Sequence, residues 1–368
     1  MPIVKLFKKH TVLCIATLAS IITCFFVPPS LEYIEYFDLK TLSCLFLTLA
    51  VVCALRNIKF FTILARRIVM LTGNLRMLAL ALVYITFIGS MLIANDMALI
   101  TFLPLGYFAL SVTKQDKHMA YIFILQNISA NLGGMLTPFG NPQNLYLYTA
   151  FEIPTLEFMG IMLAPFLLAV AMLTVACFFL KNEPLAITES FPEKLNRRRT
   201  VIYLVLFALS LLIVFRTIPY WLGLIVIPII LFFMDRDALK AVDYPLLLTF
   251  VMFFIFAGNM SKIEAVNALA STLLEKSTLL ISIISCQIIS NVPSAILLTQ
   301  FTENYRELLL GVNIGGTGTI IASLASLITF SEYRILHPGD GKRYFILFTV
   351  INLIFLAVLT AAAYFIFL

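Results

Sequence analysis

Polar amides and helix-breaking residues are concentrated in one segment of a long apolar stretch, NLGGMLTPFGNPQN, from Asn131 to Asn144. It holds three glycines, two prolines, three asparagines and one glutamine. Amide oxygens can bind a cation and amide N–H groups an anion, while glycine allows close backbone approach and proline removes a backbone donor. Irregular backbone at membrane depth survives only inside protein or beside a wet cavity. The segment therefore predicts a helix that opens to bind an ion or a small substrate.

A second segment, NIGGTGTIIASLAS (Asn313–Ser326), repeats this pattern without a gap. Asn131 aligns with Asn313, Asn141 aligns with Ser323, and a pair of glycines and a threonine also coincide. Paired interruptions in the two halves of a chain are the best sequence indication of a transporter's central site. The alternative is that these glycines serve only helix packing and kinks.

Each half also carries a short polar interruption ahead of the repeated segment. These are ANDMA at 94–98 and SNVPS at 290–294, with Asn95 opposite Asn291. Asp96 is a carboxylate near the middle of an apolar stretch. Because a charge is costly to bury there, Asp96 should face a cavity or a partner, and it could exchange a proton. The alternative is a structural acid that accepts hydrogen bonds from backbone amides at the tip of a hairpin.

These segments give one predicted set of substrate- and ion-binding residues, in which glycines supply close backbone approach and polar side chains supply ligands. Its members are Asn95, Asp96, Asn131, Gly133, Gly134, Thr137, Gly140, Asn141, Gln143, Asn144, Ser290, Asn291, Asn313, Gly315, Gly316, Thr317, Thr319 and Ser323. A sodium ion would lie at Asn95, Asn291 and nearby backbone carbonyls. No other cofactor is expected, because the six cysteines form no CxxC or Cys/His cluster.

The composition predicts an all-α polytopic membrane protein. The chain has 368 residues, 61% of them hydrophobic and 12% charged, with a mean hydropathy of +1.02, whereas soluble domains average about 25% charged residues. Apolar segments of transmembrane length recur along the chain. We expect about nine spans, at 11–27, 38–55, 119–149, 158–180, 200–216, 219–234, 244–258, 306–333 and 344–366. Two further stretches, 77–112 and 277–302, are expected to be re-entrant hairpins because each has a polar break.

Basic residues predict the orientation, since cytoplasmic loops are rich in Lys and Arg. With the N-terminus inside, the C-terminus outside and both hairpins re-entrant, twenty of the 25 Lys and Arg lie inside, among them Lys5, Lys8 and Lys9. The halves are then inverted: a first repeat at 1–180, a linker with an extra span at 181–218, and a second repeat at 219–368. The mixed basic and apolar segment 56–76 is expected to lie on the cytoplasmic surface as an amphipathic helix.

These motifs resemble the ion transporter superfamily, which includes arsenite permeases, NhaD-type sodium/proton antiporters, citrate–metal permeases and divalent anion/sodium symporters. The resemblance covers nearly the whole chain. It implies two inverted repeats, each with a re-entrant hairpin and a broken helix, a scaffold able to dimerise, and elevator-like movement. In the anion symporters the hairpin tips read Ser-Asn-Thr. Here they read Ala94-Asn95-Asp96 and Ser290-Asn291-Val292, which keeps the asparagines and the second serine and is closer to the arsenite and antiporter branches.

The expected function is secondary active transport of a small anion, such as a di- or tricarboxylate or an inorganic oxyanion, coupled to H⁺ or Na⁺. The alternative is a sodium/proton antiporter of the NhaD type. An enzyme is not expected, because the spans lack a Ser/His/Asp set, an HExxH motif and a Walker motif. The expected partners are the substrate anion and the bilayer of a prokaryotic inner membrane, without nucleic acid. A homodimer and an ATP-hydrolysing partner chain stay open as alternatives.

Overall fold

The computed structural model describes residues 11–185 and 195–367. Its secondary structure in these ranges is helical, apart from one isolated bridge between Asn74 and Pro184. The basic N-terminal residues used to predict the orientation and most of the polar linker lie outside the described residues.

The prediction of a polytopic membrane protein is confirmed. Seven helical stretches in the described ranges are long and apolar enough to cross a membrane, and shorter apolar helices accompany them. The helices that match the predicted uninterrupted spans are a different set from those seven. They are α2 (Thr11–Cys24), α3 (Leu39–Asn57), α9 (Thr155–Phe178), α10 (Arg197–Val214), α11 (Tyr220–Met234), α13 (Tyr244–Lys262) and α19 (Gly341–Ala362). Their bounds lie within a few residues of the predicted spans, because long apolar runs are the strongest local signal in a sequence.

Both predicted hairpins are present as pairs of helices joined by a single residue. In the first, α5 (Leu75–Ile93) and α6 (Asn95–Val112) meet at Ala94, whose φ is 66°. In the second, α15 (Thr278–Ile289) and α16 (Asn291–Leu298) meet at Ser290, whose φ is 78°. A non-glycine residue with positive φ is uncommon and strained. The same unusual turn therefore occurs in both halves.

The two hairpins differ in length. Helices α15 and α16 have 12 and 8 residues, or about 18 and 12 Å at 1.5 Å per residue, which is well short of a hydrocarbon core of about 30 Å. Helices α5 and α6 have 19 and 18 residues and are long enough to cross. Their tip nevertheless ends beside the break in the following helix, because Asn95 Nδ2 donates to Asn131 Oδ1 over 3.2 Å.

A broken helix follows each hairpin. The first consists of α7 (Met119–Gly133), the 3-10 turn η3 (Gly134–Leu136) and α8 (Pro142–Ala150). The second consists of α17 (Tyr305–Ile314) and α18 (Leu324–Leu336). Helix α7 forms the middle of the core, because every residue from Ile122 to Met135 is buried. The breaks therefore lie inside protein, where polar groups must find partners.

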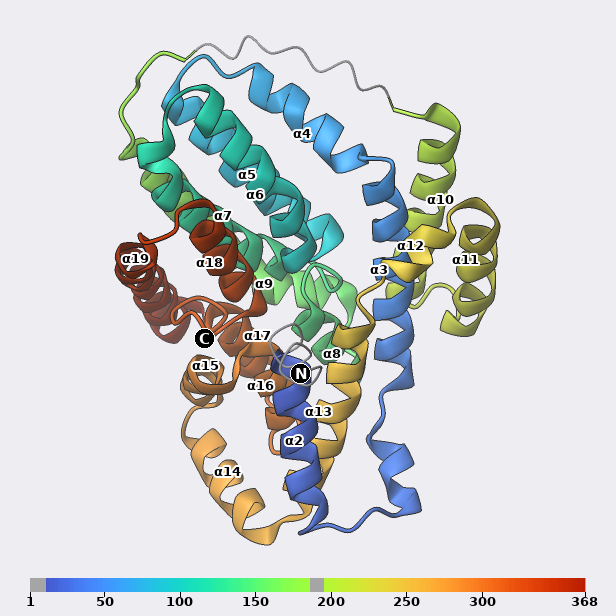
Figure 1. The fold of residues 1–368 in the computed structure, drawn as a ribbon. Helices are drawn as coiled ribbons and strands as arrows, with labels where there is room; N and C mark the ends of the chain where they lie inside the picture. Colours follow the sequence, from blue (N-terminus) through green and yellow to red (C-terminus); the bar gives the residue numbers. More distant parts are fainter. Residues whose placement is uncertain (1–10, 186–194, 368) are drawn as a thin grey trace.

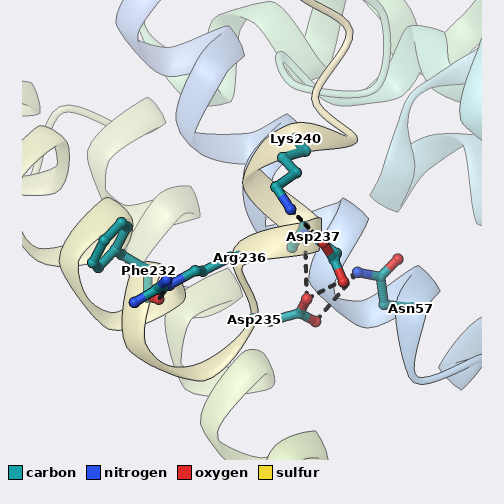
Figure 2. Close-up of polar contacts among 7 residues, drawn as sticks. Asn57, Phe232, Asp235, Arg236, Asp237 and Lys240 are labelled. Carbon is teal, nitrogen blue, oxygen red and sulfur yellow. Dashed lines mark hydrogen bonds and ion pairs between the residues drawn. The ribbon is translucent and has the colours of Figure 1, made fainter.

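Short helices lie at the ends of the bundle. Helix α4 (Phe60–Met70) falls within the predicted amphipathic segment, runs beside α5 and α6 (Figure 1), and exposes Leu64 and Ile68. Helix α14 (Glu264–Lys276) precedes the second hairpin. Helix α12 (Arg236–Lys240) links α11 to α13. Figure 2 shows the polar contacts at α12. Asn57 Nδ2 of α3 donates to Oδ1 of Asp235, the N-cap of α12, over 3.1 Å, and Lys240 pairs with Asp237 within α12 over 3.0 Å.

Candidate functional site

The two hairpin tips have the same hydrogen bond. Asn95 Oδ1 accepts from the backbone N–H of Asp96 over 2.9 Å, and Asn291 Oδ1 accepts from the backbone N–H of Val292 over 2.9 Å. Each asparagine follows the residue with positive φ and opens the second helix of its hairpin. The local sequence thus produces a tight turn whose amide group is already oriented at the start of a helix.

The second arms of the broken helices begin in the same way. Asn141 precedes α8 with φ −136° and ψ 144°, and Ser323 precedes α18 with φ −148° and ψ 152°. Pro142 fits the first position of α8 because proline there lacks only an N–H that has no helical partner. The gapless sequence alignment had paired Asn141 with Ser323, and both residues are N-caps.

Buried amides tie the two halves together. Asn131 Nδ2 donates to Ser323 Oγ over 3.0 Å, and Asn313 Nδ2 donates to Asn144 Oδ1 over 2.6 Å. Asn141 Nδ2 donates to the backbone oxygen of Asn131 over 3.1 Å and lies 3.5 Å from Asn313 Oδ1. All five side chains belong to residues that are at most 2% exposed. Because an unpaired polar group is expensive at this depth, the network holds the two breaks against each other.

Asn144 also satisfies carbonyls that the first break leaves free. Its Nδ2 lies 3.1 Å from Gly134 O, 3.3 Å from Met135 O and 3.4 Å from Thr137 O. One amide group on α8 therefore takes over bonds that a continuous helix would have made through its backbone.

A cavity of about 420 Å³ lies where the hairpin tips meet. Asn95 and Asp96 from the first tip, and Ser290 and Asn291 from the second, line it. The opposite wall comes from α2 and α13, through Ile15, Ala19, Leu246, Thr249, Phe253 and Phe256. Pro142 at the start of α8 and Leu324 at the start of α18 also line it. The amino-terminal ends of four helices, α6, α8, α16 and α18, therefore face one cavity.

This arrangement offers two kinds of electrostatic interaction. Helix amino termini carry partial positive charge and free N–H groups, which favour an anion. Asp96 supplies a carboxylate, and its Oδ1 is buried without a hydrogen-bond partner among the described residues. None of the described residues that line the cavity is a lysine or an arginine. The cavity can therefore hold an anion through helix ends and amides, and a cation or proton at Asp96.

No cluster of three His, Cys, Asp or Glu side chains exists within 11–185 and 195–367. A sodium ion at the predicted position would therefore rely on amide and carbonyl oxygens together with Asp96. Hard monovalent and divalent cations accept such oxygen ligands. Asn95, Asp96 and Asn291 line the same cavity.

The predicted set divides into three groups by position. Asn95, Asp96, Ser290 and Asn291 line the cavity. Asn131, Asn141, Asn144, Asn313 and Ser323 form the amide network behind it.

The remaining members hold the backbone of the breaks. Thr137 Oγ1 donates to Met91 O over 3.1 Å, and Thr317 Oγ1 donates to Ile314 O over 2.6 Å. Gln143 is buried, and its Oε1 has no partner among the described residues. The others are Gly133, Gly134, Gly140, Gly315, Gly316 and Thr319, most of which allow close packing of the backbone. A Cβ on Gly133, for instance, would stand 2.2 Å from Phe87 O, so this glycine packs α7 against α5.

Sequence reasoning missed Gln287. From α15 its Nε2 donates to Gly315 O over 2.8 Å and to Thr317 O over 3.1 Å, and its Oε1 accepts from Thr319 N over 2.8 Å. It therefore supports the second break as Asn144 supports the first. The available signal was a lone amide residue in an apolar helix, four positions before Asn291.

Comparison with known proteins gives a consistent result. The family model described as citrate transporter matches residues 4–305. The uncharacterized transporter MJ0456 of Methanocaldococcus jannaschii is 31% identical over 345 residues, which is 90% of this chain and 91% of that protein. The inner membrane protein YbiR of Escherichia coli K12 is 31% identical over 281 residues, which is 73% of each chain.

Proposed function

Because the chain belongs to the citrate transporter family and is a membrane transporter rather than an enzyme, we propose that it moves a small anion by secondary active transport. The substrate would be a di- or tricarboxylate or an inorganic oxyanion, and the coupling ion H⁺ or Na⁺. The observation that carries this proposal is the convergence of four helix amino termini on one cavity beside Asp96.

The anion would be bound without a basic side chain. Amino-terminal N–H groups of α18, and the side-chain amides of Asn95 and Asn291, face the cavity and can donate to an oxyanion. Helix α8 would contribute its amino-terminal dipole, because Pro142, its residue in the cavity wall, has no N–H. A charge held this way is stabilised by fixed dipoles that need little rearrangement when the substrate arrives. The cavity volume of about 420 Å³ accommodates a small molecule of this class.

Asp96 would link the substrate to the coupling ion. An ionised carboxylate beside a bound anion is unfavourable, because like charges repel at close range. Protonation of Asp96, or a sodium ion between its carboxylate and the amide oxygens, removes that repulsion. Anion and cation would therefore enter the cavity together, which is the requirement for coupled uptake.

A sodium/proton antiporter is the second candidate. It is favoured by the presence of a carboxylate, and the absence of Lys and Arg, among the described residues that line the cavity. In that case Na⁺ and H⁺ would compete for Asp96, and no anion would be required.

We also propose that residues 1–180 and 219–368 are inverted repeats joined by 181–218, in an inner membrane with the N-terminus inside. The cavity is bounded by the first turns of α2 and α13, at Thr11, Val12 and Leu246, and these ends would be cytoplasmic. The substrate site would then be reached from the cytoplasm in this conformation. The buried bonds between the breaks support movement of both broken helices as one body against a scaffold that could dimerise.

The test is to record currents from purified protein in liposomes on a solid-supported membrane. Citrate, succinate, sulfate, phosphate and arsenite would be applied at constant sodium, followed by a sodium jump without anion. A current that needs an anion supports the permease, and a pH-sensitive sodium current without anion supports the antiporter. A vesicle pH assay detects electroneutral exchange. Absence of both current and pH change with every solute would refute both proposals.

Asp96→Asn tests the carboxylate of Asp96, because it removes the charge and keeps a side chain of similar size. We expect coupled transport to fall roughly tenfold or more, because a charge-assisted interaction contributes about 1.5–3 kcal/mol and a tenfold change requires about 1.4 kcal/mol. Asp237→Asn is the matched control, since Asp237 is exposed in α12 (Figure 2). Full proton- or sodium-coupled transport by Asp96→Asn would refute the assignment of Asp96.

A further inference from the structure

The two hairpins differ at their open ends, which are the ends opposite the tips at Ala94 and Ser290. In the first half, residues 180–185 lie across the open end of α5 and α6. Leu75 N donates to Glu183 O over 2.9 Å, Leu185 N donates to Gly73 O over 2.9 Å, and Arg76 donates to Leu180 O over 3.0 Å. A strap of extended backbone therefore closes this end of the first hairpin.

The equivalent place in the second half is a cavity of about 570 Å³. It lies among the end of α14, the first residues of α15 and α17, and the residues that follow α16. Its lining includes Glu275, Lys276, Ser277, Thr278, Thr302 and Glu307. Acidic, basic and hydroxyl groups thus surround the space that the strap fills in the first half.

The same difference continues along the hairpin into the membrane. In the first half α5 is joined to α9: Tyr84 Oη donates to Val170 O over 3.2 Å and bonds to Thr174 Oγ1, and the rings of Phe87 and Phe166 lie 5.0 Å apart. No such hydrogen bond or ring contact joins α15 to α19 among the described residues.

A groove of about 640 Å³ occupies the corresponding position in the second half. Its walls include Leu280, Ile283 and Ile284 of α15, and Leu353, Leu356 and Ala357 of α19. Leu280 and Ile283 precede Ser290 by the same numbers of residues as Tyr84 and Phe87 precede Ala94. The groove is therefore the space that two aromatic side chains fill in the first half.

Thr360 gives independent evidence that a partner is missing from the groove. It stands as far from the start of α19 as Thr174 stands from the start of α9. Thr174 bonds to Tyr84, whereas Thr360 lines the groove and its Oγ1 is buried without a partner among the described residues. A group that fills this groove would pack against aliphatic side chains and could reach one hydroxyl.

The polar cavity and the apolar groove are adjacent, because Tyr364 lines both. Helix α19 is one of the stretches apolar enough to span the membrane, so the groove faces acyl chains rather than water. We propose that the two together bind one phospholipid of the bilayer, with an acyl chain between α15 and α19 and an ester carbonyl, near the junction of the two spaces at Tyr364, within reach of the Thr360 hydroxyl. Its headgroup would carry both a phosphate, held by Lys276, and an ammonium, held by Glu275, as an ethanolamine lipid does.

Filling the groove from the protein side tests the proposal. Native mass spectrometry of the purified full chain, with phosphatidylethanolamine added, should show one retained lipid. The double variant Leu280→Tyr/Ile283→Phe, which copies the first half, should lower the lipid-bound fraction roughly tenfold or more, because several buried methylene groups are displaced. Val350→Phe is the control: Val350 is exposed on α19 but does not line the groove. Equal lipid retention by the double variant and Val350→Phe would overturn the proposal.

The headgroup assignment has its own readout. Glu275→Gln should reduce the preference for phosphatidylethanolamine over phosphatidylglycerol, and Lys276→Gln should weaken binding of both lipids. In the wild-type protein, a photo-crosslinking phosphatidylethanolamine should label α15 and α19 above the lipid-facing surface of α9. Even labelling of all these helices would refute the site without relying on any variant that could misfold.

Discussion

Replacing Gly134 by alanine should force apart the two arms of the first broken helix. A Cβ on Gly134 would lie 2.3 Å from Asn141 Oδ1 and 2.7 Å from Gly140 O. Gly140 O belongs to the backbone, and the Asn141 side chain is held by its bond to Asn131 O over 3.1 Å. Neither neighbour can move without breaking part of the amide network.

The size of the effect follows from these contacts. Overpacking a filled interior costs about 1–3 kcal/mol, and a buried amide that loses its partner costs about 1–3 kcal/mol. Because the two effects share the Asn141 side chain and are not fully additive, we expect the free energy of unfolding to fall by about 2–4 kcal/mol. Transport should be lost, since Asn141 occupies the N-cap position of α8, the helix whose first residue, Pro142, lines the cavity.

The assay compares thermal unfolding in detergent and transport in liposomes with those of Gly160→Ala. A Cβ on Gly160 of α9 would meet nothing within 4 Å, so this control should leave transport intact and gain up to about 1 kcal/mol from helix propensity. The two substitutions therefore have opposite expected signs. If Gly134→Ala melted with Gly160→Ala and transported at the wild-type rate, the close approach at the break would have no functional role.

Three further predictions concern polar contacts away from the substrate. A double-mutant cycle with Asn144→Leu and Asn313→Leu should give a coupling free energy of unfolding of about 1 kcal/mol. A value near zero would show that the hydrogen bond between Asn313 and Asn144 does not contribute to stability. Gln287→Leu should lower the free energy of unfolding by about 2 kcal/mol and speed amide exchange at 315–319, and unchanged exchange there would contradict its supporting role. The hydrogen bond from Gln115, with the charge of Lys117, lowers the pKa of Glu183 below its usual 4.5. Protection of the Leu75 N–H from hydrogen exchange should therefore persist above pH 4.5 and be lost as pH falls through that lowered pKa. Glu183→Gln should remove this pH dependence.

Local sequence predicted where the helices are interrupted. Proline and glycine end helices through their own backbone geometry, and apolar runs of fixed length mark spans without reference to neighbours. The breaks at 134–141 and 315–323 follow from such signals, and the tips at Ala94 and Ser290 follow from short polar interruptions of apolar stretches. Each is a property of a few adjacent residues.

What the sequence did not show depends on contacts between distant elements. The first hairpin has helices of full transmembrane length, and contacts with the first broken helix, such as that of Asn95 with Asn131, reveal how deep its tip lies. Gln287 supports the second break through three bonds to residues at least 28 positions away. No local pattern distinguishes such an amide from one that faces a lipid headgroup, because its partners are determined by tertiary packing.

The hydrogen bonds between the two halves show which contacts the sequence alignment predicts and which it does not. Asn131 reaches Ser323, and its counterpart Asn313 approaches Asn141, the counterpart of Ser323. This reciprocity is what two inverted copies packed about a common axis would give, and the alignment alone supplied the pairs. The reciprocity does not extend to the next turn of the helices. Asn313 bonds to Asn144, but Ser326, the counterpart of Asn144, has a shorter side chain and bonds to Asn127 and Ser323 instead of to Asn131. The repeat thus fixes backbone position in both halves, whereas side-chain length decides which partners are reached, and that is where the two halves of the site acquire different chemistry.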